Sequence, residues 1–318
     1  MLRRIILGSW LLGAAGAALA QIDAPQLGWV PDGTRIRPVY GIPASAAVGA
    51  AVGTQDLLRA AASASRNYVL VCATDTGVVS VYQPGTGLTP LDGAGIAPDS
   101  IVLSPGGSAA ALWFNSIQQV QIVTGLPETP SIRQLDAAFL GSAPVALALS
   151  DDGAWLAGAW RGETSAGVYA FGPNGEVNRL PIENPVSALA FFALAHDIAA
   201  ASTGGLLRVT GIGSFAQVSA LAAFADSSSP ALAVAVTQDN KVVIAVDRSG
   251  LITAAHTDSG AATTIDCGCS PEGLFAMGPS AFRLTALRGG AFTLFDAAIG
   301  EVLFAPLALS ESAEGAAQ

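Results

Sequence analysis

Positive charge is scarce in this sequence. Among its 318 residues Lys241 is the only lysine, and charged residues of all kinds make up 12%, about half the usual share. The formal net charge is −10. An acidic chain with so few cations lacks the basic surface that nucleic acids and anionic membranes attract, so we expect neither as a partner.

Residues of metal sites and of acid–base catalysis are also few. His196 and His256 are the only histidines, no Cys-x-x-Cys or His-x-x-x-His pair occurs, and no Gly-x-Ser-x-Gly motif marks a serine nucleophile. The glycine-rich turn at 211–213 opens no helix, which a dinucleotide cofactor would require. These absences predict no metal, no cofactor and no catalytic residue. We favour a protein that is not an enzyme; the alternative is a hydrolase or oxidoreductase with an active site at the mouth of a channel.

Long apolar runs are missing after the first 20 residues. Arg3 and Arg4 precede an apolar stretch at 5–17, and Ala-Leu-Ala at 18–20 is typical of a signal-peptidase site. This pattern predicts a signal peptide at 1–20, cleaved before Gln21. A membrane anchor is the alternative, but the stretch is short for a membrane span. We expect the mature chain to be periplasmic or secreted, without a transmembrane segment, and monomeric.

Small apolar residues and glycine are abundant. Hydrophobic residues make up 51%, many of them alanine, and there are 36 glycines. Residues 144–182 contain four short apolar runs separated by turn sequences, including Asp-Asp-Gly at 151–153 and Pro-Asn-Gly at 173–175. Tight hairpins need such residues because they tolerate a positive φ. Four antiparallel strands in about 40 residues match one blade of a β-propeller.

The same pattern recurs along the chain at steps of roughly 41 to 45 residues. Runs such as Ala-Leu-Ala-Val-Ala-Val at 231–236 are apolar at every position, as expected for strands whose two faces are both buried between neighbouring blades. Two stacked β-sandwiches are the alternative, but they do not need a period this regular. We place the inner strands of six blades near Leu57, Ser100, Val145, Val186, Ala231 and Gly273.

The predicted fold class is an all-β propeller of four-stranded antiparallel blades, seven in number with one incomplete. Residues 57–309 supply six repeats, and 21–56 supply the partial blade, in which strands at 27–30 and 35–39 match the outer half of a blade. A ring must close to remove its exposed edges, and we assign the closing strand to 302–309. The alternative is a six-bladed ring with the N-terminal hairpin packed outside it. Residues 310–318 are expected to form a disordered tail.

Two turn segments carry a resemblance to a known family. Leu-Ser-Pro-Gly-Gly at 103–107 and Leu-Ser-Asp-Asp-Gly at 149–153 resemble the Leu-Ser-x-x-Gly segments of exported bacterial propellers with WD40-type or YVTN-type repeats. Gly-Val-Tyr-Ala-Phe at 167–171 is similar to the third strand of those repeats. The Gly-His and Trp-Asp dipeptides of WD40 repeats are missing, as is Tyr-Val-Thr-Asn itself. The resemblance implies a scaffold or binding role and transfers no catalytic residue.

Several loops predicted to share one face carry the candidate binding residues. In a propeller, loops that join second to third strands lie on the same face as the loops between blades. An aromatic residue flanked by arginine on a rigid scaffold is typical of a contact patch, so we expect a protein, peptide or glycan of the cell envelope to bind there. The ligand-contact candidates are Trp160, Arg161, Asp247, Arg248, Arg288, Asp75 and Asn115.

The three cysteines fall into two groups. Cys72 lies within Val-Leu-Val-Cys-Ala, a strand sequence, and is expected to be a buried free thiol. Cys267 and Cys269 lie in a loop between blades, where export would favour oxidation; they either form a disulfide with each other or stay free.

Overall fold

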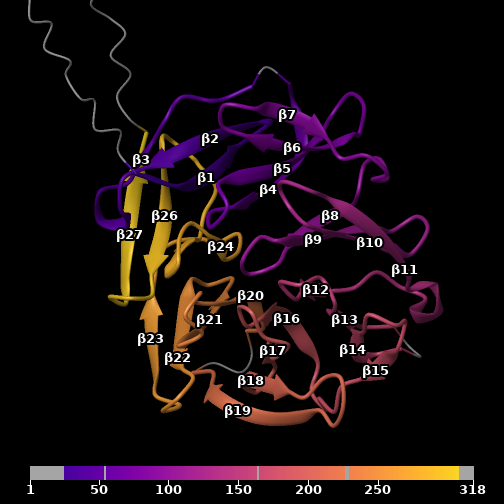
Figure 1. The fold of residues 1–318 in the computed structure, drawn as a ribbon. Coiled ribbons are helices and arrows are strands. Elements are labelled where there is room, and N and C mark those ends of the chain that lie inside the picture. The colour runs from indigo at the N-terminus through magenta and orange to yellow at the C-terminus, as the bar shows by residue number, and fades with distance from the viewer. Residues whose placement is uncertain (1–24, 54, 163–164, 226–228, 308–318) are drawn as a thin grey trace, which may run out of the picture.

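The fold is an all-β ring of seven blades around a central channel (Figure 1). The computed structural model describes residues 25–53, 55–162, 165–225 and 229–307. In that part of the chain the helical segments are two single turns, η1 (Pro43–Ser45) and η2 (Ala138–Leu140). No described helix is long and apolar enough to cross a bilayer. The predicted signal peptide at 1–20 and tail at 310–318 lie outside the described residues.

Six blades are four-stranded antiparallel sheets whose strands follow chain order from the channel outward. Blades 2 to 4 contain β4 (Leu57–Ser63), β5 (Tyr68–Ala73), β6 (Val79–Gln83), β7 (Gly87–Pro90); β8 (Ser100–Leu103), β9 (Ala109–Phe114), β10 (Gln119–Thr124), β11 (Ser131–Asp136); and β12 (Ala146–Leu149), β13 (Leu156–Trp160), β14 (Gly167–Phe171), β15 (Val177–Arg179). Blades 5 to 7 contain β16 (Val186–Phe191), β17 (Ile198–Ser202), β18 (Gly205–Thr210), β19 (Gln217–Ala223); β20 (Ala231–Val236), β21 (Val242–Asp247), β22 (Leu251–His256), β23 (Ala262–Asp266); and β24 (Phe275–Ala276), β25 (Ala281–Arg283), β26 (Ala291–Asp296), β27 (Glu301–Pro306). The predicted six repeats are therefore present.

Blade 1 comes from the N-terminal segment and has three strands, β1 (Gln26–Asp32), β2 (Arg35–Tyr40) and β3 (Ala47–Val48). The Thr34 carbonyl, just after the end of β1, accepts a hydrogen bond from the Leu57 amide at the start of β4. The end of β1 therefore lies beside the start of β4, and β1 runs opposite to the inner strands of the other blades. By direction, β1 to β3 correspond to the second, third and fourth strands of a regular blade. The innermost position of blade 1 is empty among the described residues.

The position of the N-terminal strands within their blade differs from the prediction. They were expected to be the outer half of a blade, yet Trp29 and Pro31 of β1 line the channel. The outermost strand is β3, a third strand that the sequence did not predict. The sequence does not predict the direction of β1 and β2, because both strands are short and their apolar pattern is the same in either direction.

Ring closure also uses less of the C-terminus than predicted. Residues 301–306 form the outermost strand of blade 7, paired with β26 along its length. Its side chains pack against blade 1, but the backbone pairing with blade 1 is a single parallel bridge between Leu307 and Val48. Of the expected closing strand at 302–309, the last two residues lie outside the described part.

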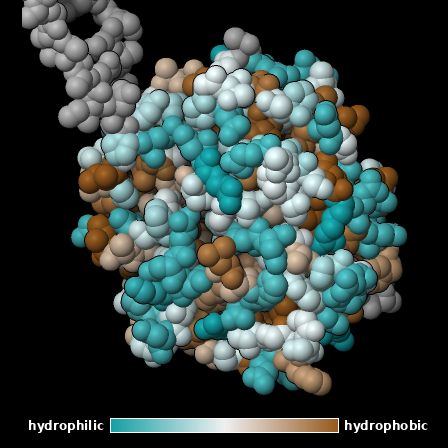
Figure 2. Space-filling view, in the orientation of Figure 1, coloured by the Kyte–Doolittle hydropathy of each residue, from teal (hydrophilic) through white to brown (hydrophobic). Residues whose placement is uncertain are grey.

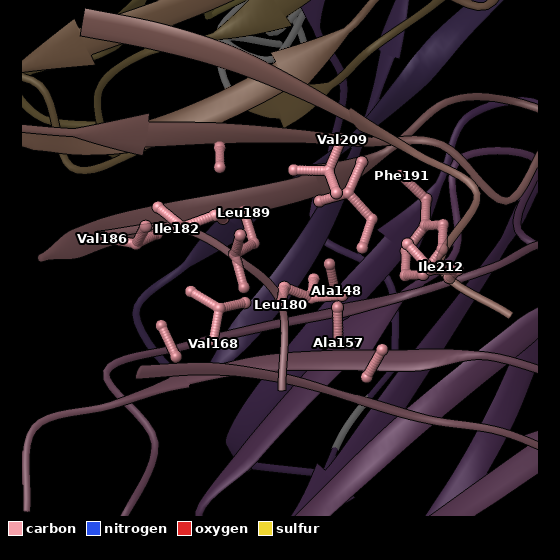
Figure 3. Packing of buried hydrophobic residues seen from close by; sticks show 14 of the residues in the cluster. Ala148, Ala157, Val168, Leu180, Ile182, Val186, Leu189, Phe191, Val209 and Ile212 are labelled. Atoms are coloured by element: carbon pink, nitrogen blue, oxygen red, sulfur yellow. The ribbon is translucent and has the colours of Figure 1, made fainter. Parts of the chain in front are cut away.

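Apolar side chains pack at every junction between adjacent blades, including the one that closes the ring. The buried apolar side chains form seven clusters, one at each junction between adjacent blades. Figure 3 shows the cluster between blades 4 and 5, where Ala148 and Ala157 face Leu189 and Val209. Every residue of second strands such as β17 is buried, which confirms that both sheet faces are covered. Alanine on these strands lets the sheets approach closely.

The Leu-Ser-x-x-Gly segments have a clear local role. Ser104 and Ser150 accept hydrogen bonds through their hydroxyls from the backbone amides five residues later, 3.1 and 2.9 Å away, which fixes the turn between first and second strands. Gly107 and Gly153 both have φ of +66°, and a Cβ there would collide with Ser63 or Thr124 of the preceding blade. Glycine is required at both positions by conformation and by close approach.

Two loop faces result from this topology. We call the face with the loops between blades and the loops joining second to third strands the crossover face. The hairpin face carries the loops joining first to second and third to fourth strands. On the hairpin face, loops of successive blades are hydrogen-bonded to one another from blade 2 to blade 7. The connecting bonds are Arg66 to Gly106, Gly106 to Asp151, Leu194 to Asp151, Ala193 to Asn240 and Gln238 to Pro279.

Candidate functional site

The seven predicted contact residues all belong to the crossover face but fall on two separate arcs. Asp75, Asn115, Trp160 and Arg161 follow second strands of blades 2 to 4. The other three belong to blades 6 and 7, so the structure does not gather all seven into one patch.

Trp160 is buried rather than presented to a partner. Only 2% of the residue is exposed, and its indole N–H donates to the Ser142 carbonyl at 3.0 Å. The ring packs edge-on against Tyr169 and Phe171, with centroids 6.0 and 5.8 Å away. Arg161, the next residue, is exposed. The arginine of the predicted aromatic–arginine pair is therefore available, and the aromatic ring is not.

Asp75 and Asn115 are exposed but held by local hydrogen bonds. The Gln55 side chain donates to the Asp75 carboxylate at 3.2 Å, and this bond is the largest cause that lowers the pKa of Asp75 below its ordinary value. Gln118 donates to the Asn115 side-chain oxygen at 3.0 Å. Each of the two side chains therefore has a local hydrogen-bond partner and remains open to solvent.

Two of the three candidates on blades 6 and 7, Asp247 and Arg288, are bonded to neighbouring side chains or amides. Asp247 is buried and accepts three hydrogen bonds, from the Ser249 amide and hydroxyl and from the Leu251 amide. Burial alone would raise the pKa of Asp247, but these bonds together hold it below its ordinary value. Arg248 is exposed. Arg288, also exposed, pairs with Glu272 at 2.6 Å.

The three cysteines are in two different states. Cys267 and Cys269 form a disulfide, and Cys72 is a buried free thiol. Burial raises the pKa of the Cys72 thiol. No group of three His, Cys, Asp or Glu side chains in the described part of the chain is arranged to hold a metal ion.

Sequence reasoning missed a group of exposed apolar side chains on the crossover face. They occupy loops or strand ends of three consecutive blades. Ile96 interrupts a glycine-rich turn and Ile117 a polar one, which is a visible signal, whereas the other three stand beside apolar neighbours and have no such signal. We call this group the crossover patch. Its members are Leu58 (48% exposed), Ile96 (66%), Ile117 (55%), Phe139 (61%) and Val145 (44%).

The hairpin face has its own exposed apolar residues, but they are more dispersed. Leu194 and Phe215 on blade 5 are 91% and 89% exposed, and the others belong to different blades. On the side of the ring seen in Figure 2, apolar side chains form small separate groups among hydrophilic ones, and one group lies near the centre.

The central channel contains a cavity of about 330 Å³. Its wall consists mainly of apolar side chains from the inner strands of blades 2 to 7 and from β1. Arg283 is the only ionisable side chain in that wall among the described residues. Sequence reasoning missed it, although an arginine in a second strand that is otherwise apolar is a visible signal.

Comparisons with known proteins agree with this architecture. The structure of apo AztD from Citrobacter koseri matches with a TM-score of 0.58 and 14% identity, over 88% of this chain and 81% of that one. The chain has the β-propeller fold. A second Citrobacter koseri AztD structure gives a TM-score of 0.60 at 14% identity, over 89% and 83%. The β-propeller domain of Myceliophteria thermophila Cps50 (Swd1) matches with a TM-score of 0.46 at 15% identity, over 63% and 65%.

At 14% identity the likeness to AztD concerns the fold alone. No protein-family model matches the sequence, and no curated protein matches it. The surface and the channel of this chain are therefore the features that bear on its function.

Proposed function

We propose that this propeller is a non-catalytic exported scaffold that binds a protein or peptide through the crossover face of blades 2 to 4. The observation that carries the proposal is the crossover patch. Five large apolar side chains of three consecutive blades are exposed in loops or strand ends of one face, where each leaves apolar area in water. Large apolar side chains gathered on one exposed face are typical of an interaction site.

The surroundings of the patch also suit a protein interface. Asp75, Asn115 and Arg161 lie on the same three blades and would form a polar rim around an apolar centre, the usual anatomy of such interfaces. Of the three partner classes expected from the sequence, a glycan fits least. Sugar-binding surfaces rely on aromatic rings, and Phe139 is the only aromatic member of the patch, because Trp160 is buried.

Export is the second part of the proposal. It is supported by the signal-peptide pattern at 1–20 and by the Cys267–Cys269 disulfide, since disulfides persist in oxidising compartments such as the periplasm or the extracellular space. N-terminal sequencing of the protein recovered outside the cytoplasm should begin at Gln21. A chain that still begins at Met1 would contradict export by this route.

Charge substitutions within the patch test the binding face. The variant with Ile117→Asp and Phe139→Asp should lose the envelope protein or peptide that the wild-type protein captures after crosslinking, because both changes bury charge at an apolar interface. Phe215→Asp is the matched control, since Phe215 is even more exposed (89%) but belongs to the hairpin face. Equal capture by the double variant and the control would overturn the proposal.

A further inference from the structure

The wall of the central channel contains one charged group, and its environment is unusual for a cation. The Arg283 residue is 5% exposed, and its guanidinium carbon lies 4.1 Å from the centre of the Phe275 ring. One Nη donates to the Thr285 carbonyl at 2.7 Å, while the fully buried Nε has no hydrogen-bond partner among the described residues. The Arg283 side chain is therefore held by Thr285 and Phe275, but its Nε–H lacks a hydrogen-bond acceptor among the described residues.

The charge of Arg283 has no ion-pair partner among the described residues. Burial lowers the pKa of Arg283 to about 10, partly offset by the charge of Glu272, so the side chain is cationic at neutral pH. Glu272 itself is engaged by Arg288 at 2.6 Å. Buried charges in proteins are ordinarily paired, because an isolated one loses its hydration without compensation.

Arg283 is part of the channel wall where blades 7 and 1 meet. It belongs to β25, a second strand, and lies opposite Phe275 of the short inner strand β24. Trp29 and Pro31 of β1 line the same cavity from blade 1.

The rest of the cavity is apolar. Inner-strand residues such as Ile101, Leu149, Phe191 and Val234 form its wall, and it extends to hairpin-face residues that include Pro105 and Pro279. Its volume of about 330 Å³ lies at the lower end of the range for ligand pockets. One water occupies roughly 30 Å³ in the liquid. If each non-hydrogen atom of a ligand needs a similar volume, the cavity holds about ten of them.

From this arrangement we infer that the channel binds a small apolar carboxylate, with its hydrocarbon part among the inner strands and its carboxylate at Arg283. The carboxylate would supply the counter-charge that Arg283 lacks, through charge-assisted hydrogen bonds for which guanidinium is well suited. This site is separate from the crossover patch, so it stands whether or not a protein binds there.

The probes follow from the shape and charge of the site. Sodium octanoate has ten non-hydrogen atoms, 1-octanol has a similar chain without the charge, and octylammonium has the opposite charge. The chain carries a formal net charge of −10, which favours octylammonium everywhere except at a localised cation. Calorimetric titration of the wild-type protein should show octanoate binding more tightly than both others, and inorganic phosphate, which has no apolar part, binding more weakly than octanoate.

Substitution of the arginine provides the second test. Arg283→Met keeps the length of the side chain and should weaken octanoate binding about tenfold or more, while leaving 1-octanol binding unchanged. Arg283→Lys should retain part of the preference for octanoate. Arg179→Met on the outer strand β15 is the control and should bind octanoate as the wild type does.

Three results would overturn the inference. They are octanoate binding no tighter than 1-octanol or octylammonium, no octanoate binding at millimolar concentration, and unchanged octanoate affinity in Arg283→Met. The comparison among probes uses only the wild-type protein, so it decides the matter even if Arg283→Met does not fold. Loss of macromolecular capture by the crossover-patch variant would leave these results unaffected, which separates the two proposals.

Discussion

Asp151 is the side chain whose loss should most weaken the hairpin face. It belongs to the turn between β12 and β13 of blade 4 and is 8% exposed. One carboxylate oxygen accepts from the Gly106 amide of blade 3 at 2.5 Å, and the other accepts from the Leu194 amide of blade 5 at 2.8 Å. A single carboxylate therefore joins three blades, and Asp151→Ala removes both connections.

The expected cost follows from those two bonds. A hydrogen bond to a charged acceptor contributes about 1.5–3 kcal/mol, which gives about 3–6 kcal/mol for two. Both amides are only partly buried, so water can reach them in the variant and recover part of that energy. We expect Asp151→Ala to lower the free energy of unfolding by about 2–4 kcal/mol. Asp151→Asn keeps one acceptor oxygen, so its free energy of unfolding should lie between those of the wild type and Asp151→Ala.

Urea unfolding followed by circular dichroism measures this difference. Asp258→Ala is the matched control, because Asp258 is exposed and bonds only within its own turn, to the Ser259 amide at 2.7 Å. The control should lose less than about 1 kcal/mol. If Asp151→Ala were no more destabilised than Asp258→Ala, the stabilising role of the hydrogen bonds between hairpin-face loops would be refuted.

Three further predictions address the N-terminal blade, a strained turn and the thiol. Deleting residues 21–40 should lower the melting temperature and cause association, because it exposes apolar clusters of blades 2 and 7; a deletion variant that stays monomeric and melts like the full mature chain would contradict a seven-bladed ring. Leu194→Gly should stabilise the protein by about 0.5–1 kcal/mol in the same urea assay, since Leu194 has a φ of +54° and is exposed; a loss of stability would show that its side chain has a packing role. Without reductant, a thiol reagent should find no reactive cysteine in the native protein near pH 8 and one after unfolding, because burial raises the pKa of Cys72; rapid native labelling would contradict its burial.

The repeat architecture could be predicted because its signal is local and is repeated six times. Turn sequences at fixed offsets reveal the hairpins, and all-apolar strands such as β20 reveal sheets covered on both faces. The N-terminal strands occur once, so no repetition supports their assignment. Their direction depends on contacts with Leu57 and blade 7 that are distant in sequence.

The binding residues were harder to predict because exposure depends on the surrounding blades. Trp160 stands beside Arg161 in the sequence, yet the indole turns inward to Ser142 and the guanidinium turns outward. Phe139 is the reverse case, an aromatic residue within an apolar stretch that the loop between blades holds in solvent. Local sequence cannot distinguish these two outcomes.

Hydrogen–deuterium exchange with a captured partner tests the proposed binding face most directly. Amide exchange of the mature protein would be compared with and without the partner, peptide by peptide. The account predicts slower exchange in the crossover-face loops at 92–99, 115–118 and 137–145 and little change in the hairpin-face loops at 192–197 and 211–216. Protection confined to the hairpin-face loops, with none at Ile96, Ile117 or Phe139, would contradict it.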